Sequence, residues 1–169
     1  MCINCGSHAT FCDNNLKHIS INLDNNNHYT DFQSALNQEV IKDRKCTNCQ
    51  NNCSKHKEKT TLVLPNSLQC MIVYVHNYIN TDKGIIKSKS RLSGLNVPFF
   101  TVPSLDNTRF TKSSIIIRQG IETNTGHFKI WTKDLRSKNW LYINDNKVRS
   151  YVELFKVLDN VLLVILMRL

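Results

Sequence analysis

The chain lacks both the long apolar segments of a membrane protein and the repetitive segments of a linker. Its longest apolar run, Val161 to Met167, is far shorter than the roughly 20 residues that a helix needs to cross a bilayer. No internal repeat and no Gly/Ser stretch divides the 169 residues. The N-terminus also lacks the basic-then-apolar pattern of a secretory signal, which favours a cytoplasmic or nuclear location. With 41% hydrophobic and 21% charged residues, the composition predicts one globular domain with a core of its own.

Acidic side chains are scarce as well. The 13 Asp and Glu stand against 22 Lys and Arg, which leaves a formal net charge of +9. The basic residues are spread along the sequence, and their densest stretch is Lys83 to Arg91. This spacing favours an exposed lysine-rich surface, and an anionic partner such as nucleic acid is the weaker interpretation.

Seven cysteines are present, and their odd number, without a secretion signal, argues against a disulfide framework. Cys2/Cys5 and Cys46/Cys49 each have the C-x-x-C spacing, in which one tight turn directs two thiolates at one ion. Two such turns predict a structural zinc ribbon with four cysteine ligands. A redox-active pair is disfavoured because no βαβ pattern surrounds either motif, and unliganded thiols are the remaining alternative.

Three cysteines fall outside these pairs. Cys53 extends the second pair and could replace one of its ligands, although a position on a polar loop is favoured, and Cys12 has no assigned role. Cys70 lies in the apolar run Leu68 to Val75, which predicts a buried strand and therefore a thiol in the core.

Apolar periodicity predicts a chain made mostly of strands. We expect a half-buried strand at Ile19, Ile21 and Leu23, a helix from Phe32 with its N-cap at Thr30-Asp31, a loop over Asn77 to Asn96, a short helix over Tyr151 to Leu158 and a central strand over Val161 to Met167. The predicted fold class is α+β, dominated by antiparallel strands, with a zinc finger at one end.

Two aromatic segments, 126–131 and 140–145, form a predicted β-hairpin around a charged loop. If the loop is symmetric, Trp131 faces Trp140 and His127 faces Asn144. Side chains that oppose each other on one sheet face lie roughly 5 Å apart at Cβ, and an amide beside an imidazole is how a general base is oriented. The simpler alternative is a surface histidine followed by an ordinary turn at Asn144-Asp145.

The order of these motifs resembles the C-terminal half of the ubiquitin-specific proteases, which are papain-like cysteine peptidases. The matching segments are Cys2/Cys5, Cys46/Cys49, Leu64-Pro65-Asn66-Ser67-Leu68, the strand Ile115 to Gly120, Gly126-His127-Phe128, Trp140 to Val148 and the closing strand Val161 to Leu166. They cover nearly all of the chain.

The resemblance implies a division into zinc-ribbon fingers over 1–60 and a palm over 61–169, with an N-terminal thumb half missing. It implies that His127 is the general base, that Asn144 orients the imidazole and that Asp145 supports the site or positions the oxyanion side. The four paired cysteines would hold a structural zinc ion. Ubiquitin or a ubiquitin-like protein would be the partner, and no membrane is involved.

Three departures from the family pattern keep other functions open. The nucleophile cysteine box is absent, Arg118 stands where histidine is usual, and Tyr74-Val75 replaces the usual Arg-Phe. A histidine without a thiol cannot perform covalent catalysis. The chain is therefore expected to be either part of a longer peptidase or a pseudoenzyme that binds ubiquitin without cleaving it. A zinc-ribbon nucleic-acid binder is the third hypothesis, and it leaves the His127/Asn144 pair unexplained.

Overall fold

The computed structural model describes residues 2, 5–7, 18–23, 29–38, 40–42, 56–58, 62–82, 84–104, 106–120, 126–155 and 157–169. Strands dominate this part of the chain, as the sequence predicts. They are β1 (Ile19–Asn22), β2 (Tyr29–Asp31), β3 (Val40–Lys42), β4 (His56–Glu58), β5 (Cys70–His76), β6 (Tyr78–Thr81), β7 (Gly84–Lys87), β8 (Arg91–Ser93), β9 (Phe100–Thr101), β10 (Arg109–Gln119), β11 (His127–Lys133), β12 (Trp140–Asn144), β13 (Lys147–Tyr151), β14 (Val157–Leu158) and β15 (Val161–Arg168). The single helix of the described residues is α1 (Phe32–Leu36).

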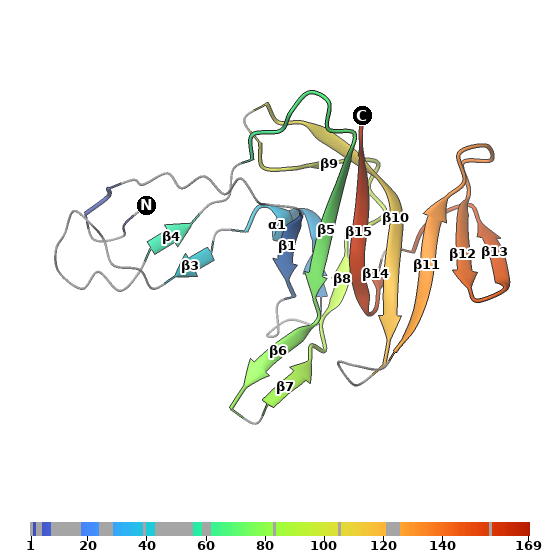
Figure 1. Cartoon of the computed structure of the whole chain (residues 1–169), viewed down its shortest axis with the longest axis horizontal. Helices are drawn as coiled ribbons and strands as arrows, with labels where there is room; N and C mark the ends of the chain where they lie inside the picture. Colours follow the sequence, from blue (N-terminus) through green and yellow to red (C-terminus); the bar gives the residue numbers. More distant parts are fainter. Residues whose placement is uncertain are drawn as a thin grey trace.

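One large sheet organises the molecule (Figure 1). Its strand order is β1-β5-β15-β10-β11-β12-β13, and the short strand β9 pairs with β10 beside this path. All pairs in the sheet are antiparallel except β1 with β5. The strand expected over Val161 to Met167 lies in the middle, between β5 and β10, so its continuous apolar run is explained by its central position.

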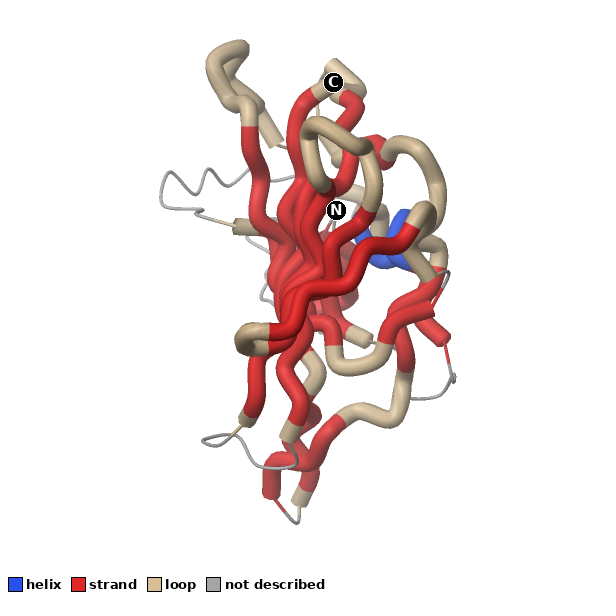
Figure 2. Tube along the Cα trace, turned by 90° about the vertical axis from the view of Figure 1, so that its right-hand side faces the viewer, coloured by secondary structure: helices blue, strands red, loops and turns tan. Residues whose placement is uncertain are grey.

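The two faces of the large sheet have different surroundings. Figure 2 shows α1 and the smaller strands on one side of it. We call this side the covered face. Its side chains include Val73, Ile115 and Val164, which are completely buried, and Phe32 of α1 contacts Phe100 edge to face at 4.8 Å between ring centroids. This layer supplies the hydrophobic core.

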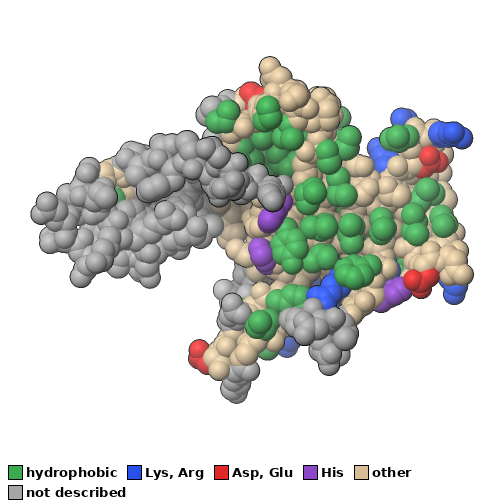
Figure 3. Space-filling model, viewed as in Figure 1, with side chains coloured by type: hydrophobic (Ala, Val, Ile, Leu, Met, Phe, Trp, Pro, Cys, Tyr) green, Lys and Arg blue, Asp and Glu red, His purple; other side chains and the backbone are tan. Residues whose placement is uncertain are grey.

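The opposite side, which we call the open face, is also apolar. Successive register partners from β5 to β13 form one row across it, made of Tyr74, Leu163, Ile116, Ile130, Ile143 and Val148. Figure 3 shows hydrophobic side chains across this face, and Val148 is 60% exposed. An antiparallel sheet that is packed on one side usually carries polar residues on the other, so the row is unusual.

Helix α1 begins as the sequence predicts. The Asp31 carboxylate accepts a hydrogen bond from the Ser34 backbone N–H at 2.8 Å, which satisfies one of the unpaired N–H groups of the first turn. Phe32, Ala35 and Leu36 are buried. Leu36 is the last helical residue.

Three expectations were wrong. Tyr151 to Leu158 is not a helix, because β13 ends at Tyr151 and β14 begins at Val157. The expected loop Asn77 to Asn96 contains β6, β7 and β8. Cys70 is exposed rather than buried, because it alternates with the buried Met71 and Val73 along β5. Within the described residues, no helix has the length and apolarity to span a membrane.

Candidate active site

The predicted pair of side chains is in contact at one end of the large sheet. His127 opens β11, Asn144 closes β12, and the Nε2 atom of His127 lies 2.5 Å from Oδ1 of Asn144. The carboxylate of Asp145 lies 3.6 Å from the same nitrogen. Because an amide oxygen can only accept, Nε2 is the nitrogen that carries the proton, and Nδ1 keeps a lone pair. The His127 side chain is 44% exposed, so a second group has room to approach it.

The strand register that brings them together differs from the predicted one. Trp131 pairs with Tyr142, not with Trp140, and Lys133 pairs with Trp140. The ladder between β11 and β12 stops at Ile130 and Ile143. A shift of two residues leaves every side chain on its original face, because the side-chain period of a strand is two. His127 and Asn144 therefore remain on one face and meet as diagonal neighbours.

Two residues beside the pair stand where the backbone restricts the choice of side chain. Asp145 has φ of 52° in the turn between β12 and β13, a conformation that Asp tolerates better than most residues. A Cβ at Gly126 would lie 2.8 Å from the Gln119 carbonyl oxygen and 2.9 Å from Arg118 Nε. Glycine is therefore required directly before His127, and the Gly-His pair in the sequence has a steric cause.

Arg118 connects this end of the sheet to the hairpin of β6 and β7. It contacts Tyr78 through a hydrogen bond of 3.4 Å to the hydroxyl and through the ring, 5.9 Å from guanidinium to centroid. Lys87 donates to the Gly120 carbonyl at 2.9 Å. Burial and the charge of Arg118 lower the pKa of Lys87. The end of β10 that precedes residue 121 is thus attached to a neighbouring hairpin.

A cavity of about 400 Å³ lies on the covered face next to the pair. Trp131, Tyr142, Tyr151 and Phe155 line it together with Ile117, Gln119, Lys129, Leu158, Asp159 and Asn160. Sequence reasoning missed this cavity because Tyr151 and Phe155 were assigned to a helix. The spacing of Tyr151 and Phe155 in the sequence gave no other indication of the cavity.

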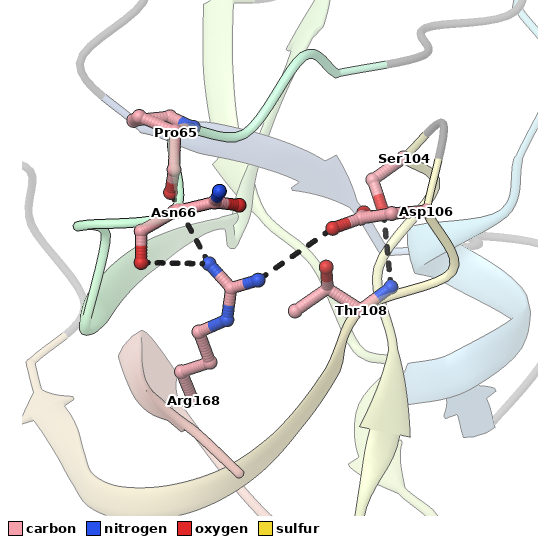
Figure 4. Close-up of polar contacts among 6 residues, drawn as sticks. All are labelled: Pro65, Asn66, Ser104, Asp106, Thr108 and Arg168. Atoms are coloured by element: carbon pink, nitrogen blue, oxygen red, sulfur yellow. Dashed lines mark hydrogen bonds and ion pairs between the residues drawn. The ribbon is translucent and has the colours of Figure 1, made fainter.

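The Leu-Pro-x-x-Leu segment is attached to the end of β15 (Figure 4). The Arg168 guanidinium donates to the carbonyl oxygens of Pro65 and Asn66, both at 3.2 Å, and lies 3.6 Å from the Asp106 carboxylate. The nearby Thr108 hydroxyl and a hydrogen bond of 2.8 Å from the Ser104 hydroxyl lower the pKa of Asp106. These contacts are structural, since they lie at the opposite end of β10 from Gln119, the register partner of His127.

The predicted zinc ligands are described only in part. Cys2 is buried and Cys5 is exposed, and the Gly6 backbone N–H donates to the Cys2 carbonyl at 2.9 Å. Thiols at this spacing fit the chemistry of zinc. Cys46, Cys49, Cys12 and Cys53 lie outside the described residues. The described residues alone contain no group of three or more metal-ligating side chains.

Comparison with known proteins shows which of them share the fold of this chain. No protein-family model and no curated sequence matches the chain. Several solved structures match it. Those of the SAGA DUB module Ubp8/Sgf11/Sus1/Sgf73 bound to monoubiquitin and of the same module bound to ubiquitin aldehyde each match with a TM-score of 0.64 and 13% identity. A yeast SAGA DUB module with an Sgf73 mutant matches with a TM-score of 0.61.

The match covers 90% of this chain and 35% or 36% of the neighbouring chain in the two ubiquitin-containing structures. The chain thus has the fold of part of the Ubp8 ubiquitin-specific protease, the fold that the motif order predicted. It spans about a third of that protein's length.

Proposed function

We propose that this chain is the base-bearing part of a cysteine-type deubiquitinase, which hydrolyses isopeptide bonds to ubiquitin or to a ubiquitin-like protein. The hydrogen bond between His127 and Asn144 carries the proposal. The neighbours with this fold are complexes with monoubiquitin and ubiquitin aldehyde. Residues 1–60 would form the fingers and residues 61–169 the palm.

The chemistry follows from the tautomer of His127. With Nε2–H donated to Asn144, Nδ1 can accept the proton of a cysteine thiol and generate the thiolate nucleophile. The Asp145 carboxylate, 3.6 Å from Nε2, would stabilise the imidazolium that results. The same imidazolium would then protonate the leaving amine, as a general acid.

In this proposal the thiol comes from a second part of the enzyme, because the family's nucleophile cysteine box is absent from the sequence. The open face offers a packing surface for it, because its apolar row crosses β11 and β12 and Phe128, which follows His127 directly, is 54% exposed. His127 itself lies on the covered side, with Trp131, so the thiol would reach it around the end of the sheet. Packing on the open face would remove apolar area from water at about 25 cal/mol per Å².

A structural zinc ion held by Cys2, Cys5, Cys46 and Cys49 is part of the same proposal. It would supply folding energy to the N-terminal region and would take no part in the reaction. Metal analysis of purified chain should give one zinc per molecule, and Cys46→Ser with Cys49→Ser should abolish it. A full zinc content in that double variant would contradict the assignment.

The decisive experiment joins this chain to the thiol-bearing part of the protease whose fold it shares. Treatment with ubiquitin that carries a C-terminal electrophile should give a covalent adduct. His127→Ala should remove the adduct, Asn144→Ala should slow its formation at least tenfold, and Phe99→Ala, distant from the pair, should have no effect. A folded chimera that forms no adduct would rule the peptidase out.

The pseudoenzyme is the second candidate, and the missing nucleophile motif favours it. It predicts that the unmodified chain binds ubiquitin with micromolar affinity, as transient interfaces do. Titration of labelled ubiquitin with the chain measures this. Absence of any resonance shift would remove this candidate.

A further inference from the structure

Arg118, in β10, lies on the open face at the end of the sheet that holds the candidate pair. It is the register partner of Phe128 in β11. Because side chains alternate along a strand, Gly126 and Phe128 face the same side as Arg118. His127, between them, projects to the opposite side, where it contacts Asn144. Arg118 is thus behind the backbone that carries the imidazole.

The side chain of Arg118 lies directly against Gly126. A Cβ on this glycine would lie 2.9 Å from Nε and 3.2 Å from Cγ of Arg118, so the arginine stem occupies the space that a side chain would need there. The backbone of Gly126 can approach β10 only as far as this stem permits. Because the peptide unit is planar and stiff, a displacement of Gly126 would move the Cα of His127 with it.

Arg118 is itself held from two sides. Its backbone N–H donates to the Asn160 carbonyl at 2.9 Å. Its guanidinium donates to the Tyr78 hydroxyl at 3.4 Å and lies 5.9 Å from the centroid of the same ring. Lys87, the register partner of Tyr78 in the hairpin of β6 and β7, donates to the Gly120 carbonyl at 2.9 Å. One cross-strand pair of this hairpin therefore holds the end of β10 at two points.

Two cations, Arg118 and Lys87, are close together at this end of the sheet. Burial and the charge of Arg118 lower the pKa of Lys87, so the two charges repel each other. A lysine at position 118 would keep the same repulsion. Arginine differs from it in the planar guanidinium, which can lie against a ring while the stem covers a neighbouring surface. The contacts with Tyr78 and Gly126 use both of these properties.

We propose that Arg118 is a positioning residue for the candidate active site, which supports Gly126 from the open face and so keeps the imidazole of His127 against Asn144. The inference rests on the proposed function for its effect on catalysis, and it adds a residue that acts through another. Without this support Gly126 gains freedom to move. Reaction rates depend steeply on the placement of the reacting groups, so a small displacement of the ring would slow proton transfer.

The first test uses the ¹⁵N-labelled chain alone and follows the two imidazole nitrogen resonances of His127 at about pH 8.5, where a histidine is neutral. A His127→Asn variant assigns these signals. In the native chain, Nε2 should have the shift of a protonated nitrogen and Nδ1 that of an unprotonated one. Arg118→Ala should reduce the difference between the two shifts about twofold, because the ring then exchanges tautomers. The signals of His18, beside the edge strand β1, should not change.

Further variants separate positioning from a general loss of stability. Arg118→Lys keeps a stem against Gly126 and should retain most of the shift difference. Arg149→Ala, which removes an exposed arginine of β13, should leave the difference at its native value. A native difference in folded Arg118→Ala, or an equal loss in Arg149→Ala, would overturn the proposal.

Tyr78→Leu removes the ring and the hydroxyl that contact the guanidinium. It should reduce the shift difference in the same direction as Arg118→Ala and by a smaller amount. If Arg118→Ala does not fold, this variant decides the question, and a native shift difference in it would overturn the proposal.

The second test measures catalysis in the chimera. Arg118→Ala should lower the maximal rate of adduct formation to a value between those of the native chimera and Asn144→Ala. The concentration of ubiquitin electrophile that gives half of this rate should not change, because Arg118 positions the base and binds no substrate. Arg118→Lys should restore most of the rate. A native maximal rate in Arg118→Ala would overturn the positioning role and leave the peptidase intact.

The tautomer measurement requires neither a thiol nor ubiquitin, so its outcome is separate from that of the proposed function. If no chimera forms an adduct, the peptidase is ruled out, and the shift difference alone still decides whether Arg118 positions His127.

Discussion

The two faces of the large sheet contain the same kinds of residue in different surroundings. Ile115 and Ile116 are neighbours in β10, yet Ile115 is completely buried on the covered face and Ile116 is only partly buried on the open face. Tyr74 and Val75 differ in the same way along β5. An apolar side chain stabilises the fold in proportion to the area that it loses to neighbours, so the two faces contribute unequally.

This difference separates the residues that hold the chain together from those that are available for a partner. Most apolar patches on a monomer are small, and a larger continuous one marks an interaction site. The row from Tyr74 to Val148 extends across most of the sheet. The covered face is therefore the core, and the open face is the surface on which we propose that a second part of the enzyme packs.

The largest effect should come from removing apolar volume on the covered face. Ile115→Ala should lower the free energy of unfolding by about 2 to 5 kcal/mol, because it leaves a cavity in a closed layer. Ile116→Ala, one residue away, should cost about 1 kcal/mol, since part of its surface is already in water. Urea denaturation of both variants measures the difference. Equal losses would mean that the faces are equivalent.

The next effect concerns a buried charge on the covered face. Burial, together with the nearby charge of Lys133, lowers the pKa of Lys112 from 10.5 to about 8. Its ammonium donates to the Val97 carbonyl and lies 5.6 Å from the centroid of the Phe100 ring. Between pH 8 and 10.5 the unfolded chain holds a proton at this site that the folded chain has released. Stability should therefore rise with pH across this window.

The variant Lys112→Met removes the titrating group. Relative to it, the native chain should gain on the order of 2 kcal/mol in unfolding free energy from pH 8 to pH 10.5. Denaturant titrations of the two proteins at several pH values give this difference directly. Parallel pH profiles would show that Lys112 is not desolvated in solution.

A smaller effect is expected where polar contacts attach a loop to the end of β15. Arg168→Ala removes the hydrogen bonds to the carbonyls of Pro65 and Asn66 and should cost about 1 to 2 kcal/mol. Arg149→Ala, at an exposed position of β13, should change stability by less than about 0.5 kcal/mol. Thermal unfolding compares the two. A loss in Arg168→Ala no greater than in Arg149→Ala would assign the loop no stabilising role.

The sequence predicted the central part of this fold well, for a physical reason. The apolar run 161–167 and the β-branched residues around Ile115 have no polar alternation, and only a central strand accommodates that pattern. Residues 151–158 were misassigned, because Tyr151, Phe155 and Leu158 fall at helical spacing. Tertiary packing around Trp131 overrides that local pattern and holds the segment in an extended path.

The candidate site, like the fold, was predictable only in part. The contact between His127 and Asn144 was predictable although the register was not, because strand parity survives a shift of two residues. The length of the β11–β12 ladder, which ends at Ile130, depends on the turn and on twist and has no sequence signature here. The cavity beside the pair depends on the misassigned segment, so it could not be anticipated.

The smallest effect on stability, and the sharpest contrast between the faces, is expected at Ile130. This residue lies in the middle of the apolar row, on the same strand as His127, and is 36% exposed. Ile130→Lys should cost under about 1 kcal/mol, because the lysine stem can cover its neighbours while the ammonium stays in water. Leu135→Lys, in the exposed loop after β11, is the matched control.

Ile130→Lys should nevertheless abolish adduct formation in the chimera, because a second layer packed on the open face would bury the ammonium without a partner. Leu135→Lys should form the adduct at the native rate. If Ile130→Lys also reacts normally, the open face is not the surface on which the thiol-bearing part packs. The apolar row would then require a different partner, while the stability contrast between Ile115 and Ile116 would be unaffected.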